Sequence, residues 1–308
     1  MDLTNFKPLL AAKIETEEDY NKLQYPLLAS PKIDGIRTIN HPERGPITRT
    51  LKPIPNKYIR EYLAHPKLKW LDGETVVGNP RDVGLFNKTQ SAVMSQSGTP
   101  DFTYYVFDHL GGATLSCPFN LRLNDAREAV AAYGLSSRVR FLEHVEISNR
   151  LELDLYEGNC VARGYEGIML RSPKGRYKFN RSTLRDGILI KLKRFEDAEA
   201  IIIGWEPLER NENAPTIDAL GYQKRSAHQA GKVTDDTLLG KFLVRGLGGR
   251  WANVEFSIGS GLTEALRREY RNCIDLLIAK KQVVTYKYQA HGSKDAPRMP
   301  IFKGLRHD

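Results

Sequence analysis

The sequence predicts an α+β domain built on antiparallel sheets, followed by a smaller and mostly β domain. Through about residue 194, segments typical of strands and helices mix without the regular alternation that a parallel sheet requires. After Lys193 the chain changes to short strand-like segments separated by glycine-rich turns. One amphipathic helix, predicted over 263–279, interrupts these later strands. We therefore expect two domains, 1–194 and 195–308.

Helices of the first domain are predicted from their caps and their apolar spacing. Thr16 is a candidate N-cap with Asp19 in the first turn, and Pro55 suits the first turn of another helix. Gly134 and Gly164 suit helix C-termini. The expected helices cover 16–23, 55–64, 83–95, 122–133 and 150–163.

Strands of the first domain are predicted where apolar and β-branched residues lie between turn residues. The segment 102–110 (FTYYVFDHL) is the clearest, because it is rich in aromatic and β-branched residues. The expected strands cover 36–39, 71–77, 102–110, 165–171 and 188–193.

The second domain is predicted to be an OB-fold β-barrel. The helix 263–279 places Leu266, Tyr270, Ile274 and Leu277 on one face, with Thr263 as its cap. About five strands and one helix in roughly 110 residues suit the OB-fold. The polar stretch 209–237 lacks periodicity and is expected to be a long, basic loop. The expected strands include 200–205, 241–245, 253–258 and 283–289.

Composition limits the classes of function. The 308 residues carry a formal net charge of +9, which favours nucleic acid or an acidic membrane as partner, although simple solubility explains the charge equally well. Three scattered cysteines fit neither a disulfide framework nor a CxxC metal site. The N-terminus lacks the features of a signal peptide, and no apolar run approaches the roughly 20 residues that span a bilayer. We expect a soluble, intracellular protein with no membrane partner.

The run Lys32-Ile33-Asp34-Gly35-Ile36-Arg37 is the most informative motif. A lysine amine attacks phosphorus only where neighbouring cations, a metal or desolvation favour its neutral form. Alone, a lysine near an Asp-Gly turn is more often part of a solvated turn. Further motifs follow it in order along the chain: Thr48-Arg49, Asp72-Gly73-Glu74, Phe107-Asp108, Glu166-Gly-Ile-Met-Leu-Arg171 and Lys191-Leu192-Lys193.

Together, these motifs resemble the ordered motif set of the covalent nucleotidyltransferases, which include DNA ligases, RNA ligases and mRNA capping enzymes. The resemblance spans essentially the whole chain. It implies a nucleotidyltransferase (adenylation) core followed by an OB domain. It also implies that Lys32 attacks the α-phosphate of a nucleotide and becomes a lysyl–nucleoside monophosphate.

The resemblance implies roles for other charged residues of the motifs. Arg37 and Arg49 match positions that contact the ribose and phosphates, and later the 5′-phosphate of a nick. The alternative is that both are surface arginines that make weak ion pairs. Glu74 matches an acid that binds the ribose or a metal, and Glu166 matches the acid that holds the catalytic Mg²⁺ or Mn²⁺.

The remaining motif residues are expected to contact the nucleotide. Lys191 and Lys193 alternate along a strand and share one face, where an anion such as the α-phosphate would offset their repulsion. Phe107 would ordinarily be a core residue, but the resemblance implies stacking on the base. Ile33 is also expected to contact the nucleotide, and Asp108 to be structural.

Sequence details favour the DNA ligase branch. EGIMLR is similar to the motif of DNA ligases, whereas capping enzymes tend toward DGLIF. The segments Leu220–Ser226, Gly240–Phe242 and Phe256–Leu262 resemble stretches of small viral and bacterial ATP-dependent ligases. NAD-dependent ligases carry an N-terminal domain for which Lys32 leaves no room, and a four-cysteine zinc module that this composition excludes. The implied cofactor is ATP. The implied location is the cytoplasm of a bacterium or of a virus-infected cell.

The implied activity is the sealing of 3′-OH/5′-phosphate nicks in duplex DNA by a monomer that clamps the duplex between its two domains. Two basic groups are expected to contact the DNA backbone, although each could be a solvated face. We expect the 209–237 loop to order on DNA. The two groups are Arg171, Arg176, Lys178 and Arg181 in a loop, and Lys224, Arg225, His228 and Lys232 in the OB insertion.

The C-terminus departs from the family pattern. The usual motif is RxDK, which orients pyrophosphate, whereas this chain ends at Arg306-His307-Asp308. Either Arg306 and Lys303 suffice, or the first step is slow, or the terminus is truncated.

Two alternatives remain open from the sequence. An RNA ligase or a capping guanylyltransferase would share the motif set. An OB-containing DNA-binding protein with a degenerate core is the non-enzyme alternative, although a decayed core should have lost a charged position.

Overall fold

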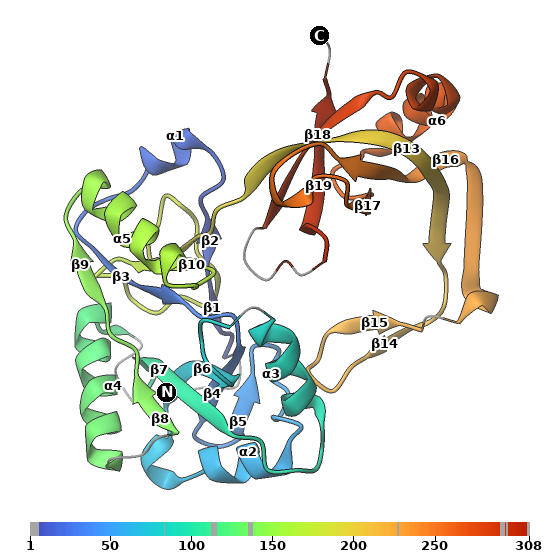
Figure 1. The fold of residues 1–308 in the computed structure, drawn as a ribbon. Helices are drawn as coiled ribbons and strands as arrows, with labels where there is room; N and C mark the ends of the chain where they lie inside the picture. Colours follow the sequence, from blue (N-terminus) through green and yellow to red (C-terminus); the bar gives the residue numbers. More distant parts are fainter. Residues whose placement is uncertain are drawn as a thin grey trace. The chain divides into compact units, whose positions relative to one another are not determined.

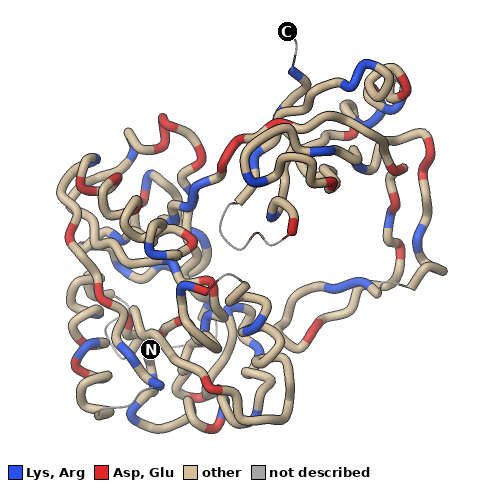
Figure 2. The backbone as a smooth tube through the Cα atoms, viewed as in Figure 1, with Lys and Arg blue, Asp and Glu red and all other residues tan. Residues whose placement is uncertain are grey.

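The computed structural model describes residues 6–82, 84–111, 116–134, 138–226, 228–289, 293 and 295–306 (Figure 1). The chain divides into two compact units. Unit 1 comprises Met1–Lys193 together with Asp218–Tyr222, and unit 2 comprises Arg194–Ile217 together with Gln223–Asp308. Figure 2 shows that basic and acidic residues are interspersed along both units. No helix in the described part of the chain is long and apolar enough to cross a membrane.

Unit 1 contains two five-stranded sheets. The first has the order β2-β12-β10-β3-β9 and the second the order β5-β4-β6-β7-β8, and most neighbours are antiparallel. The first sheet consists of β2 (Ala12–Lys13), β3 (Leu27–Lys32), β9 (Val145–Ile147), β10 (Gly167–Arg171) and β12 (Leu189–Leu192). The second consists of β4 (Ile36–His41), β5 (Gly45–Thr48), β6 (Leu71–Val77), β7 (Phe102–His109) and β8 (Val139–Phe141). A separate parallel pair joins β1 (Leu9–Leu10) to β11 (Asn180–Arg181).

The predicted cap Thr16 precedes the first helix of unit 1, whereas Pro55 lies before the N-cap of its helix and not in the first turn. Asp19 accepts a backbone hydrogen bond from Thr16, and the Asn56 side chain caps the helix that follows Pro55. Gly134 ends another helix with φ +106°. The helices are α1 (Glu17–Tyr20), α2 (Lys57–Leu63), η1 (Pro66–Leu68), α3 (Leu85–Met94), α4 (Phe119–Tyr133) and α5 (Arg150–Ala162).

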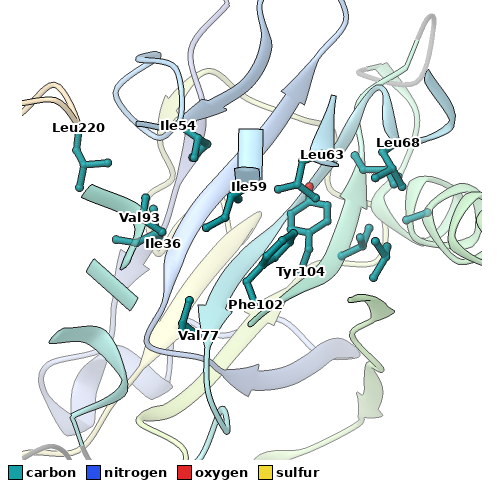
Figure 3. Close-up of a cluster of buried hydrophobic side chains, with 14 residues drawn as sticks. Ile36, Ile54, Ile59, Leu63, Leu68, Val77, Val93, Phe102, Tyr104 and Leu220 are labelled. Atoms are coloured by element: carbon teal, nitrogen blue, oxygen red, sulfur yellow. The ribbon is translucent and has the colours of Figure 1, made fainter. Parts of the chain in front are cut away.

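A hydrophobic core lies against the second sheet. Phe102 and Tyr104 of β7 pack with Ile59 and Leu63 of α2, and all four are almost fully buried (Figure 3). The alternation of buried and half-buried residues along β7 matches the aromatic pattern that predicted this strand. The predicted α+β class with antiparallel sheets is confirmed. The shorter strands β1, β2, β5, β8, β9 and β11 were not predicted, because two to four residues are too few to show a period.

Unit 2 is built on one five-stranded sheet with the order β17-β16-β13-β18-β19. Among the described residues, a parallel bridge joins Ser260, which follows β17, to Ile301 of β19, and the sheet does not close into a barrel. Thr263 caps α6 (Glu264–Ala279), whose predicted apolar face packs into the core of the unit. The strands are β13 (Glu196–Asn211), β16 (Lys232–Gly246), β17 (Glu255–Ile258), β18 (Val283–Gln289) and β19 (Arg298–Leu305).

The expectation of a long loop over 209–237 is wrong. The long strands β13 and β16 extend into this stretch, and the short strands β14 (Pro215–Ile217) and β15 (Gln223–Arg225) form a hairpin within it (Figure 1). All residues of β14 and β15 are exposed. Strands exposed on both faces carry no hydrophobic alternation, which is why the sequence pattern missed them.

The turn of this hairpin, Asp218–Tyr222, packs within unit 1. Leu220 is only 1% exposed and lies in the same core cluster as Ile54 and Val93 (Figure 3). Its carbonyl oxygen accepts hydrogen bonds from the hydroxyls of Thr48, at 3.3 Å, and of Thr50. The turn is therefore held by both apolar burial and hydrogen bonds.

Candidate active site

Lys32 lies at the junction of the two sheets of unit 1. It is the last residue of β3, opposite Gly167 of β10, and the turn after it leads into β4 of the second sheet. A Cβ atom at Gly35 would lie 2.5 Å from the carbonyl oxygen of Thr75, so this turn requires glycine. Ile33 is 6% exposed and packs against the second sheet at Val76, so the turn is anchored by a core contact.

Glu166 joins two lysines of the predicted motifs. Lys32 Nζ donates to Glu166 Oε2, and Lys193 Nζ donates to Oε1 at 2.9 Å. Burial alone would raise the pKa of Glu166, but the two lysine charges lower it to about 2. Burial also opposes the charge of Lys32, yet the charge and hydrogen bond of Glu166 raise the pKa of that lysine above its usual range. Lys32 is therefore an ammonium ion in this state and must lose a proton before it can act as a nucleophile.

Lys191 lies beside this cluster without a carboxylate partner among the described residues. Burial and the charges of Lys193 and Lys32 lower the pKa of Lys191 to about 8. Two lysines thus share one buried carboxylate, Glu166, and a third lysine, Lys191, lies close enough to feel their charge. This excess of positive charge fits the α-phosphate of a nucleotide, because an anion would relieve the repulsion.

Glu74 of β6 faces the same region. Burial raises its pKa to about 8, although the charges of Lys32 and Arg37 act in the opposite direction. No hydrogen bond from the described part of the chain reaches its carboxyl group. Glu74 is mostly protonated at neutral pH in this state.

Glu166 and Glu74 could hold a metal ion only if the phosphates of a nucleotide supplied further ligands. The described residues contain no group of three or more histidines, cysteines or acids that could hold a metal ion. Mg²⁺ usually binds one or two carboxylates and completes its shell with water and substrate phosphates. Glu166 and Glu74 both act electrostatically on Lys32, so they suit this second arrangement.

Arg37 is fixed by a two-point contact with a buried aspartate. Its Nε and Nη2 donate to the two carboxylate oxygens of Asp72 at 2.9 and 2.5 Å, and Nη1 donates to the carbonyl oxygen of Leu9. The charge of Asp72 outweighs burial and raises the pKa of Arg37 further. The Arg37 side chain is only 12% exposed, so its orientation is set by the protein.

Phe107 occupies a β-bulge. Asp72 of β6 pairs with Asp108, while the next residue, Gly73, pairs with Val106. Phe107 is therefore an extra residue in β7, and such bulges re-aim side chains beside active sites.

The Phe107 ring is available for stacking. It is half-buried and belongs to none of the hydrophobic clusters of described residues. The guanidinium carbons of Arg37 and Arg171 lie 5.8 and 5.4 Å from its ring centre.

The prediction that Arg171 lies in a loop and contacts DNA is wrong. It is the last residue of β10, and its side chain is 4% exposed. Its Nη1 donates to Asp108 Oδ2, and Arg122 Nε donates to Oδ1 of the same aspartate at 2.9 Å. A guanidinium buried in this way cannot reach a DNA backbone. The prediction that Asp108 is structural agrees with these contacts.

Arg122 is the buried residue that sequence reasoning missed. It lies in α4, is fully buried, and also donates to the carbonyl oxygens of Cys117 and Gly175. An arginine within a helix looks like a surface residue in the sequence, and its partner Asp108 lies 14 positions away.

Most of the other residues predicted to contact phosphates are exposed. Arg49 is exposed, with its guanidinium carbon 5.3 Å from the ring centre of Tyr222 in the hairpin turn. Arg176, Lys224, Arg225 and His228 are also exposed. Three contacts involve the remaining residues: Lys178 pairs with Asp186, Arg181 donates to the carbonyl oxygen of Ala11 at 2.7 Å, and Lys232 pairs with Glu209 at 2.7 Å.

The C-terminal residues are only partly described. Arg306 pairs with Glu199 at 2.9 Å, and Lys303 with Asp197 at 2.6 Å. Asp308 lies outside the described residues.

Comparisons with known proteins agree on one family. The family profile described as ATP dependent DNA ligase domain matches residues 8–193, and that described as DNA ligase OB-like domain matches residues 230–306. No curated protein matches the chain.

Solved structures give the same result. The chain is similar to the Chlorella virus DNA ligase-adenylate, with 33% identity over 98% of this chain and 99% of that chain and a TM-score of 0.55. Its fold is also similar to that of a Lig E DNA ligase, with 22% identity, 98% and 99% coverage and a TM-score of 0.64. The ligase domain of LigD from M. tuberculosis shares the fold at 18% identity, over 99% of this chain and 96% of that chain, with a TM-score of 0.51.

Proposed function

The chain belongs to the family of ATP-dependent DNA ligases, and on that premise we propose that Lys32 is the residue that carries AMP. The contact of Lys32 with Glu166 is the observation that supports this proposal most directly. It sets a lysine amine beside an acid and two further lysines at the junction of two sheets. Such a cluster has the charges that a triphosphate requires.

The proposed reaction has three steps. The neutral amine of Lys32 attacks the α-phosphorus of ATP, a nitrogen–phosphorus bond forms, and pyrophosphate leaves. The 5′-phosphate of a nick then attacks the same phosphorus, and the lysine amine leaves. Finally, the 3′-hydroxyl attacks the 5′-phosphorus, a phosphodiester bond forms, and AMP leaves.

The side chains around Lys32 would prepare these steps. Lys191 and Lys193 would neutralise phosphate charge, and Arg37 would hold an oxygen of the substrate from its fixed position. Phe107 would stack on the adenine. Mg²⁺, held by Glu166 and Glu74 together with the phosphates, would supply further charge stabilisation when bound. Lys32 must leave Glu166 as it loses its proton.

We also propose how the protein engages DNA. Exposed basic residues of both units, Arg176, Lys224 and Arg225 among them, would contact the phosphates of a nicked duplex. The protein would act as an intracellular monomer whose domains, 1–194 and 195–308, both contribute to the clamp on DNA. Arg306, which directly follows β19, is proposed to contact the nucleotide phosphates in the first step.

Labelled ATP tests the proposal directly. Wild-type protein incubated with α-labelled ATP and Mg²⁺ should become labelled, and the label should resist alkali but be lost in hot acid, as a nitrogen–phosphorus bond requires. A chase with nicked duplex DNA should move the label to the DNA and then release AMP. Lys32→Ala should give no label, whereas Lys57→Ala, at an exposed lysine of α2, should behave as wild type. Labelling of Lys32→Ala would refute Lys32 as the residue that carries AMP. Transfer of the label to nicked RNA but not to nicked DNA would refute nicked DNA as the substrate.

A further inference from the structure

We propose that Arg171 is a positioning residue for the nucleotide base, because it holds the Phe107 ring that would stack on adenine. This inference rests on the proposed function. It concerns a residue whose described contacts are with Asp108 and with the rings of Phe107 and Phe119.

Phe107 needs support from outside its own strand. As the extra residue of a bulge it is out of register with β6, and it packs into no hydrophobic cluster of the described residues. A base platform must be held in one orientation to contribute to binding.

Arg171 supplies that support from the other sheet. It ends β10 of the first sheet, and its guanidinium carbon lies 5.4 Å from the ring centre of Phe107 in the second sheet. The same carbon lies 4.4 Å from the ring centre of Phe119. A planar guanidinium can stack on aromatic rings, whereas an ammonium group can contact them only as a point charge.

Asp108 fixes Arg171 in turn. Its two carboxylate oxygens accept from Arg171 and from Arg122, and all three side chains are at most 4% exposed. Because Asp108 follows Phe107 directly in β7, the ion pair joins Arg171 to the bulge itself. The orientation of the ring is therefore tied to the first sheet, which also carries Lys32.

Arg122 provides a matched control. It binds the same carboxylate and is equally buried, but its aromatic contacts are with Phe119 and Tyr177 and do not include Phe107. A loss that arises only from disturbing the buried ion pair should affect both arginine variants alike.

The experiment measures the rate of lysyl-adenylate formation against ATP concentration. In Arg171→Lys the charge beside Asp108 is kept, and we expect the KM for ATP to rise roughly three- to tenfold while the rate at saturating ATP stays within about twofold. Arg122→Lys should keep the wild-type KM. In a Phe107→Leu background, Arg171→Lys should raise the KM no further, because both changes remove one interaction.

Three results would overturn the proposal: an unchanged KM in folded Arg171→Lys, an equal rise in Arg122→Lys, or additive effects with Phe107→Leu. Phe107→Leu alone gives a test that needs no arginine variant to fold, and an unchanged KM there would also overturn it. Failure of the wild type to form any adduct would instead refute the proposed function, so the two failures are distinguishable.

Discussion

Two clusters of ion pairs in unit 1 use the same kinds of charge in different ways. In the first, Lys32 and Lys193 meet Glu166, and the two lysine side chains remain 20% and 21% exposed. In the second, Arg122 and Arg171 meet Asp108, and the side chains are at most 4% exposed. Both clusters have more positive than negative groups. The first has three lysines, Lys191 included, beside Glu166, and the second has two arginines beside Asp108.

The difference lies in how firmly each cation is held. A lysine ammonium is a point charge on a flexible stem, so it can leave its partner when a substrate anion arrives. A buried guanidinium that donates several hydrogen bonds has a fixed orientation. The lysine cluster thus suits a reaction in which Lys32 must change partners, and the arginine cluster suits a scaffold.

The largest expected effect is on the scaffold. Asp108→Asn leaves two buried guanidinium ions without a carboxylate, and we expect a loss of about 3–5 kcal/mol in the free energy of unfolding. Chemical denaturation monitored by circular dichroism measures it. Glu255→Gln, which removes an exposed partner of Arg245, should change stability by less than about 1 kcal/mol. A loss below about 1 kcal/mol in Asp108→Asn would show that the buried cluster is not a scaffold.

The second effect concerns activity with little change of stability. In Glu166→Gln, Lys32 and Lys193 lose their charged partner, but both can turn toward water because they are partly exposed. We expect adenylate formation to slow by roughly 10²–10³-fold, the range for removing one electrostatic contact at a reacting centre. Rapid-quench measurement with labelled ATP gives the rate. If Glu166→Gln lost much of its stability but formed the adenylate at the wild-type rate, the lysine cluster would be the scaffold and not the reacting site.

The smallest effect is a dependence on pH. Because the pKa of Lys191 is lowered to about 8, this lysine is charged below pH 8 and loses its charge as pH rises through that value. Affinity for pyrophosphate should therefore fall by up to about tenfold between pH 7 and pH 9. Lys191→Met should make this decline shallower when binding is measured by calorimetry.

Glu74 requires a separate control in this experiment. Its pKa is also about 8, and its ionisation would weaken anion binding over the same range. Glu74→Gln should leave a smaller but distinct decline that Lys191→Met then removes. A profile that Lys191→Met does not alter would contradict the position of Lys191 beside the anion.

The elements that the sequence predicted correctly are those whose pattern lies within one segment of the chain. The Thr263 cap and the apolar spacing of Leu266, Tyr270 and Ile274 predicted α6, and the residues of β6 were predicted to their ends. The motif lysines Lys32 and Lys193 both contact Glu166, a third motif residue, although the resemblance implied a metal and not the lysines as the partner of that acid.

The features that escaped prediction depend on pairs of segments. The bulge at Phe107 exists only as a mismatch between β6 and β7, so the sequence of β7 alone does not show it. The burial of Arg171 depends on Asp108, 63 positions earlier in the chain. The hairpin turn at Leu220 is buried by residues of α3 and of the segment before α2, which no local pattern could indicate.

Because Lys32 is an ammonium ion in its pair with Glu166, adenylation of this lysine changes the net charge of the protein, which matters for its purification. An ammonium at Lys32 contributes one positive charge, whereas a lysyl phosphoramidate has a neutral nitrogen and one negative phosphate oxygen. Each adenylation therefore removes about two units of positive charge, because a free lysine is protonated at neutral pH. On a chain of formal charge +9 this change is large enough for cation-exchange chromatography to separate the loaded and unloaded forms without any label.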